Sequence, residues 1–187
     1  MVRILAIVGM PGSGKSVVAS YFKNMGFPII HFGEIIIREV ERRELPITPN
    51  NEQIVREGIR REHGMDVCAQ MALPLIKLQL LEHQLVIVDG LYSFKEYKTL
   101  KKEFSDDLLV LAIFTPKSIR YERLNLRQER PLTLAEAEKR DYMEIERIEK
   151  GGPIAIADLT LVNDSSQSHL YQKIEEVLAR LSLELFL

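Results

Sequence analysis

The sequence has few of the features that mark secreted, membrane or duplex-binding proteins. It contains one cysteine, Cys68, so no internal disulfide can form, which is typical of a reducing compartment. Lysine and arginine number 25 against 27 acidic residues, a formal net charge of −2, so the basic excess of a nucleic-acid-binding protein is missing. No apolar run approaches the ~20 residues that span a bilayer. We therefore expect a cytoplasmic protein that binds neither nucleic acid nor membrane.

The composition is that of one folded globular domain. Apolar residues make up 46% of the 187 residues and charged residues 28%, without repeats or low-complexity segments. This length fits a single domain over residues 1–187. The N-terminal MVRILAIVGM resembles a signal peptide, but its apolar run is short and leads into PGSGKS, so we interpret it as a core strand.

Short apolar runs alternate with helical patterns along the chain. Continuous apolarity within a run indicates burial on both faces, as in a parallel sheet covered by helices. The sequence therefore predicts an α/β fold, a doubly wound sheet of five parallel strands. The expected strands are 4–8, 27–30, 85–88, 108–114 and 159–162. The expected helices are 15–25, 33–43, 51–63, 66–83, 93–104, 116–127, 133–150 and 168–181.

One crossover is longer than a single helix requires. About fifty residues, 33–84, separate the second and third expected strands, whereas a minimal crossover needs about a dozen. We interpret this surplus as an inserted helical lobe that binds the acceptor. Pro46 and Pro49 prevent a continuous helix, Gly64 is an expected C-cap, and Pro74 should kink or split the following helix.

The most specific motif is GMPGSGKS, which follows the first strand and opens the first helix. It satisfies the G-x-x-x-x-G-K-[ST] pattern of a P-loop in the required strand–loop–helix setting. Glycines let the backbone N–H groups wrap around phosphates, and the helix adds its positive dipole end. Lys15 can reach the β- and γ-phosphates, and the Ser16 hydroxyl can bind Mg²⁺. The expected ATP-binding residues here are Gly9, Met10, Pro11, Gly12, Ser13, Gly14, Lys15, Ser16 and Val17; a glycine-rich turn without a ligand is the alternative.

An acidic residue follows the third expected strand. LVIVDG places Asp89 at the carboxyl edge of the sheet, where ligands bind in open α/β folds. We interpret Asp89 as a Walker-B-type carboxylate that holds Mg²⁺ directly or through water. The alternative is an ordinary Asp-Gly turn.

Three arginines share one face of the helix after the fourth strand, at spacing i, i+3, i+7: Arg120, Arg123 and Arg127. Arg130 follows, and Thr133 with Glu136 matches a capping box that begins the next helix. We interpret residues 120–133 as a lid whose arginines, Arg127 and Arg130 above all, stabilise charge on a migrating phosphoryl group. The alternative is a solvated charged helix, because glutamates alternate with these arginines.

The inserted lobe carries further candidates. Glu34 and Arg38 stand one helical turn apart just after the second strand, so they suit acceptor binding or an ordinary ion pair. Arg60 is a candidate acceptor-binding residue, although Arg56 and Arg60 lie among glutamates and a solvated face is the favoured interpretation. The four histidines have no metal-site spacing, and no chemical role is assigned to them.

From end to end the chain resembles dephospho-CoA kinases and the adenylate-kinase-related P-loop proteins, particularly their archaeal branch. HFGEIIIREV is similar to the dephospho-CoA kinase segment Asp-Ala-Asp followed by IIAREV, with Glu for Asp and one residue more. The resemblance implies that Glu34 is the acidic base and Arg38 binds the acceptor. IAIADLTLVNDSS resembles the family's "AD" strand, which implies that Asn163 borders the adenine, and the segment around Arg123 resembles the lid. IVDGLYS is closer to adenylate-kinase-type enzymes but lacks their following arginine.

These observations predict a kinase that uses Mg·ATP to phosphorylate a nucleotide-like small molecule, either dephospho-CoA or a nucleoside monophosphate. Glu34 or Asp89 is the expected base if the acceptor is a hydroxyl. The rival function is a regulatory P-loop ATPase that acts through a protein partner. The C-terminal LSLELFL could bind such a partner, cover the core or form a homodimer seam.

Overall fold

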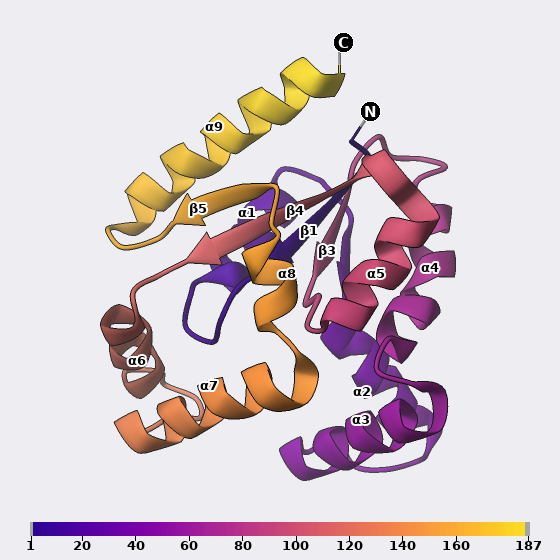
Figure 1. Cartoon of the computed structure of the whole chain (residues 1–187), viewed down its shortest axis with the longest axis vertical. Coiled ribbons are helices and arrows are strands. Elements are labelled where there is room, and N and C mark those ends of the chain that lie inside the picture. Colours follow the sequence, from indigo (N-terminus) through magenta and orange to yellow (C-terminus); the bar gives the residue numbers. More distant parts are fainter. Residues whose placement is uncertain (1, 186–187) are drawn as a thin grey trace.

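The computed structural model describes residues 2–185, apart from the side chains of residues 49 and 182–185. Its centre is a five-stranded parallel sheet in the order β2-β3-β1-β4-β5 (Figure 1). The strands are β1 (Ile4–Val8), β2 (Ile29–His31), β3 (Val86–Asp89), β4 (Leu108–Phe114) and β5 (Leu159–Val162). The predicted sheet is therefore confirmed; three strands have the predicted bounds, and β2 and β3 are shifted by one or two residues.

The helices cover both faces of this sheet. They are α1 (Lys15–Asn24), α2 (Phe32–Arg42), α3 (Pro49–His63), α4 (Val67–Gln79), α5 (Phe94–Phe104), α6 (Lys117–Asn125), α7 (Leu134–Ile148), α8 (Gly151–Ala155) and α9 (Gln167–Leu185), with a 3₁₀ turn η1 at Ser105–Asp107. Side chains of β1 alternate between two cores. Ile4, Ala6 and Val8 pack with α2 to α5, whereas Leu5 and Ile7 pack with α1 and α9. This double burial explains the unbroken apolar runs.

Local sequence signals set most helix ends. Gly64 caps α3 with φ 96°, and Thr133 with Glu136 forms the expected capping box of α7. The predicted split at Pro74 is wrong, since α4 runs through it from Val67 to Gln79. A proline removes one hydrogen bond, and the buried packing of Ala72 and Ile76 retains the helix around it. The short helix α8 was not predicted.

Two helical segments lie beyond the carboxyl ends of the strands. The crossover between β2 and β3 is helical, as expected, and brings α3 to the lower edge of Figure 1; α7 lies beside it. Within the described part of the chain, no helix is long and apolar enough to cross a bilayer. Of the C-terminal stretch 181–187, the structure describes only the Leu181 side chain, which is buried, so the proposed partner or dimer seam lies outside the described residues.

Candidate functional site

The loop between β1 and α1 has the close-wrapped backbone of a phosphate cradle. Gly12 and Gly14 adopt left-handed φ angles of 79° and 96°. A Cβ at Gly12 would lie 2.7 Å from the carbonyl oxygen of Arg120, and one at Gly14 would collide with the side-chain amide of Asn163. Glycine is therefore required here both for conformation and for space.

A polar cluster supports the loop from beneath. The Asn163 side chain donates to the Ser13 carbonyl at 2.8 Å, and the Thr115 hydroxyl lies 3.1 Å from the same oxygen. Arg123 in turn donates to the carbonyl of Asn163 at 3.2 Å. Asn163 therefore holds the P-loop directly, and Arg123 supports it through Asn163. The contact of Asn163 with adenine and the binding of ATP by Arg123 stay predictions. The buried Ser13 hydroxyl has no hydrogen-bond partner among the described residues.

Lys15 and Ser16 occupy the first turn of α1. The Lys15 ammonium donates to the carbonyls of Gly9 and Met10, at 2.7 and 3.3 Å. Burial, followed by the positive charge of Lys150, lowers the pKa of Lys15 to about 7. The Ser16 side chain is exposed, and the first turn of α1 contains no acidic residue that would compete with a bound anion.

Asp89 lies where the sequence placed it, at the end of β3. Its carboxylate is 3.1 Å from Nδ1 of His31, which ends the neighbouring strand β2 in direct register with Asp89. The sequence assigns His31 no chemical role and does not predict its contact with Asp89. The sequence signal that could have predicted this contact is that two neighbouring parallel strands each end in a polar residue, His31 and Asp89.

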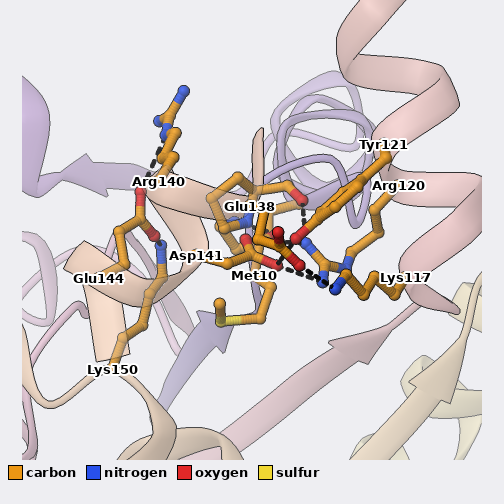
Figure 2. A network of polar contacts seen from close by, with 11 residues as sticks. Met10, Lys117, Arg120, Tyr121, Glu138, Arg140, Asp141, Glu144 and Lys150 are labelled. Carbon is orange, nitrogen blue, oxygen red and sulfur yellow. Dashed lines mark hydrogen bonds and ion pairs between the residues drawn. The ribbon is translucent and has the colours of Figure 1, made fainter. Parts of the chain in front are cut away.

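A second cluster, of Arg140, Glu144 and Lys150, comes from α7 and the turn after it (Figure 2). Lys150 is 2% exposed, forms an ion pair with Glu144 and lies 4.8 Å from the ring centre of Tyr92. Arg140 donates to the other oxygen of Glu144 at 3.1 Å. Burial opposes ionisation of Glu144, but Lys150 and Arg140 outweigh it and hold the pKa of Glu144 below its usual value. The charges of Lys150, Glu144 and Arg140 all act on Lys15.

Arg120 does not have the exposed position that a lid arginine requires. Its guanidinium is buried and pairs with both oxygens of Asp141, at 3.1 and 2.6 Å, and also donates to the Pro11 carbonyl at 2.9 Å (Figure 2). Arg120 therefore fixes α7 to the P-loop, and it belongs neither to a mobile lid nor to a solvated face. A bidentate Arg–Asp pair has the geometric specificity for this role.

The remaining predicted lid arginines lie in the loop after α6. Arg127 is exposed to solvent over much of its surface. Burial of the remaining part and the positive charge of the nearby Arg140 lower the pKa of the Arg127 guanidinium. Arg130 is also exposed and has a left-handed φ of 53°. Arg127 thus lies close to the charges around Lys15, whereas no contact of the described residues brings Arg130 there.

A cleft of about 530 Å³ lies between α3 and α7. It is lined by Gln53, Arg56, Glu57 and Arg60 of α3, by Tyr92, and by Glu136, Lys139, Arg140, Met143, Glu144, Arg147 and Ile148 of α7. Arg140 and Glu144 line this cleft, and their charges also act on Lys15. The solvated interpretation of Arg60 is wrong, because this side chain is buried against Glu96.

Glu34 and Arg38 lie at the start of α2, as expected, but both are exposed. In the part of the chain that the structure describes, neither side chain forms a hydrogen bond or ion pair, so the i, i+4 pair that the sequence offered is not formed. Both are accessible to a ligand. Their roles as base and acceptor-binding residue stay predictions.

The parallel sheet with this loop between β1 and α1 defines a P-loop kinase-like domain, and residues 8–149 match the family described as an AAA domain. The chain belongs to the UPF0200 family: the UPF0200 protein of Pyrococcus abyssi is 36% identical over 95% of this chain and 96% of that protein. The dephospho-CoA kinase from Campylobacter jejuni has a TM-score of 0.61 at 18% identity over 98% of this chain and 99% of that one. Shikimate kinase from Bacteroides thetaiotaomicron also has a TM-score of 0.61, at 12% identity over 96% and 98%. The predicted kinase resemblance is confirmed at the level of the fold.

The pKa of Lys15 predicts how the affinity for ADP depends on pH. Below pH 7 the ammonium is already charged, whereas above pH 7 a bound polyphosphate must draw a proton onto Lys15. Between pH 8 and 9.5, where phosphates are fully ionised, affinity should fall by up to about tenfold per pH unit. Lys150→Met removes a positive neighbour and should move the fall to higher pH. Calorimetry in buffers of different ionisation enthalpy measures the proton uptake.

The control for this measurement is Lys15→Met, which should bind ADP without proton uptake over the same range. An affinity that stays flat in the wild type, or an equal slope in the Lys15→Met protein, would contradict the assignment.

Proposed function

We propose that this protein is an ATP-dependent kinase that transfers the γ-phosphoryl group to a nucleotide-like acceptor, dephospho-CoA or a nucleoside monophosphate. The observation that carries the proposal is the cleft between α3 and α7, which shares Arg140 and Glu144 with the surroundings of Lys15. A P-loop that only hydrolyses ATP needs room for water, whereas a kinase needs a second substrate site beside the phosphates.

The residues around the P-loop fit ATP and Mg²⁺. Gly12 and Gly14 allow the close-wrapped loop backbone, whose N–H groups would bind phosphate, and the buried Ser13 hydroxyl has no partner among the residues described. Ser16 and Asp89 would hold Mg²⁺, which needs only one or two protein oxygens besides phosphate and water. When bound, the metal supplies positive charge that neutralises the transferring phosphates.

Charge stabilisation by the protein would come from Lys15 and from the cations beside it. In a loose phosphoryl transfer the negative charge spreads over the equatorial oxygens, so positioning and electrostatics provide most of the rate. Lys15 would release the carbonyls of Gly9 and Met10 and turn to the β- and γ-phosphates. Arg127 would approach the migrating group from the loop after α6.

The rival function is a regulatory ATPase that acts through a protein partner. It shares the P-loop with the kinase but requires no acceptor. The cleft favours the kinase. It is lined by two helices far apart in sequence, and a nucleotide switch has no need of a second binding site for a small molecule.

ADP release should be stimulated by one acceptor in a panel of AMP, CMP, UMP, GMP, dephospho-CoA and no acceptor. Lys15→Ala should abolish this turnover while circular dichroism and thermal unfolding stay close to wild type, since the P-loop lysine serves charge in the transition state. Equal ADP release with and without every acceptor would support the ATPase switch. Wild-type turnover in a folded Lys15→Ala protein would overturn both functions.

Arg127→Ala should lower kcat on the order of 10²-fold, with a smaller change in ATP affinity, because its charge is needed mainly as the transition state forms. Arg130→Ala is the matched comparison, because Arg130 lies in the same exposed loop and no contact of the described residues brings it to Lys15. The kcat of each variant is measured by steady-state kinetics with the acceptor found in the panel. Unchanged kcat in both single variants and the double variant would favour a solvated loop.

The role of Glu34 depends on the group that is phosphorylated. With a hydroxyl acceptor, Glu34→Gln should lower kcat by about 10² to 10⁴-fold, because a general base is lost, whereas Asp89→Asn should weaken Mg²⁺ binding and so change the Mg²⁺ dependence of activity. With a monophosphate acceptor no proton must leave, so Glu34→Gln should change mainly the acceptor KM. A hydroxyl acceptor combined with undiminished kcat in Glu34→Gln would transfer the role of base to Asp89.

A further inference from the structure

The cleft between α3 and α7 carries an excess of positive charge. Its lining contains five basic residues, Arg56, Arg60, Lys139, Arg140 and Arg147, against three acidic ones, Glu57, Glu136 and Glu144. Of the acidic residues, Glu144 on α7 is already shared between Arg140 and Lys150. On the α3 wall, Arg56 and Arg60 stand against one acidic lining residue, Glu57.

Arg60 is the deepest of these cations and is poorly compensated. Its side chain is 8% exposed, and its buried Nε has no hydrogen-bond partner among the described residues. Within the same described part of the chain, its one ion-pair partner is Glu96, 3.4 Å away, at the long end of hydrogen-bond geometry.

Glu96 is a weak partner because other groups already use it. Its second oxygen accepts the backbone N–H groups of Tyr92 and Ser93, both at 2.8 Å, as part of the capping box of α5. Burial raises the pKa of Glu96 despite the proximity of Arg60. A buried guanidinium with so little counter-charge is costly, and a bound anion would remove much of that cost.

Arg56 lies one helical turn before Arg60 and faces the same cleft. It is half-buried, and no hydrogen bond or ion pair of the described residues involves its side chain. Each of these two arginines, one buried and one unpaired among the described residues, offers a planar set of N–H donors that suits the oxygens of a carboxylate or phosphate.

We propose that Arg56 and Arg60 bind an anionic group of the acceptor, a carboxylate or a phosphate, within the α3–α7 cleft. This proposal rests on the proposed kinase function and assigns the residues that bind the anionic group of its acceptor. It places the anionic group on the α3 wall of the cleft, and the cations of α7 face it from the other side.

The test is anion binding to the protein saturated with Mg·ADP, so that the P-loop is occupied. Inorganic phosphate and succinate are titrated separately by calorimetry, at low and at high salt. We expect saturable binding of at least one of them. The tighter of the two identifies the class of anion, phosphate or carboxylate.

Arg56→Gln should weaken this binding by about tenfold or more, the value of one charge-assisted hydrogen bond, while ADP affinity stays the same. Arg61→Gln is the matched control, because Arg61 is exposed on the same helix and does not line the cleft. For the buried position, Arg60→Met is combined with Glu96→Gln, so that no unpaired charge is left in the core. Thermal unfolding establishes that each variant is folded.

No saturable anion binding to the ADP complex, or equal binding in Arg56→Gln and Arg61→Gln, would overturn the proposal. These outcomes are separate from the kinase test. An acceptor of the panel that stimulates ADP release with the same KM in wild type and Arg56→Gln would retain the kinase and refute the anion site. Anion binding lost in Arg56→Gln, without stimulation by any acceptor, would retain the site and refute the kinase.

Discussion

The buried ion pair between Arg120 and Asp141 is the contact on which the arrangement of the site depends. Arg120 belongs to α6, Asp141 to α7, and the same guanidinium holds the Pro11 carbonyl of the P-loop. Three segments far apart in sequence thus meet at one side chain. Removing one partner of such a buried pair costs roughly 3–5 kcal/mol, because the other charge is left uncompensated. The position of α7 relative to the phosphate cradle is therefore tightly specified.

Fixing α7 brings an unusual density of charge to Lys15. Lys150 and Arg140 contribute positive charge, and Glu144 with Asp89 opposes it. Burial is the largest cause of the lowered pKa of Lys15, and the charge of Lys150 adds to it. A nucleotide polyphosphate would supply the negative charge that a buried ammonium lacks, so the electrostatic cost present in the free protein favours binding of an anion at this place.

The sequence predicted what depends on local pattern and missed what depends on long-range contact. The parallel sheet, the P-loop and the position of Asp89 follow from apolar runs and from one specific motif, and all three have the expected place in the fold. The partner of Arg120 could not be found in this way, because Asp141 lies in another helix and i, i+4 spacing does not reach it. The role of Lys150 could not be predicted for a related reason. The sequence does not predict the turn after α7, where Glu149 has a φ of 56° and where the side chain of Lys150 is buried.

The same reason explains why the solvated interpretation of Arg60 failed. Glutamates surround Arg60 in the sequence, but its partner is Glu96, which caps a helix 36 residues later. Tyr92 then joins the two walls of the cleft: its N–H donates to Glu96 beside α3, and its ring lies beneath the Lys150 ammonium that pairs with α7. An anion that altered the Arg60–Glu96 contact would therefore act on the loop of Tyr92, whose ring contacts Lys150. This continuous path of contacts gives a ligand in the cleft a physical route to the charges around Lys15.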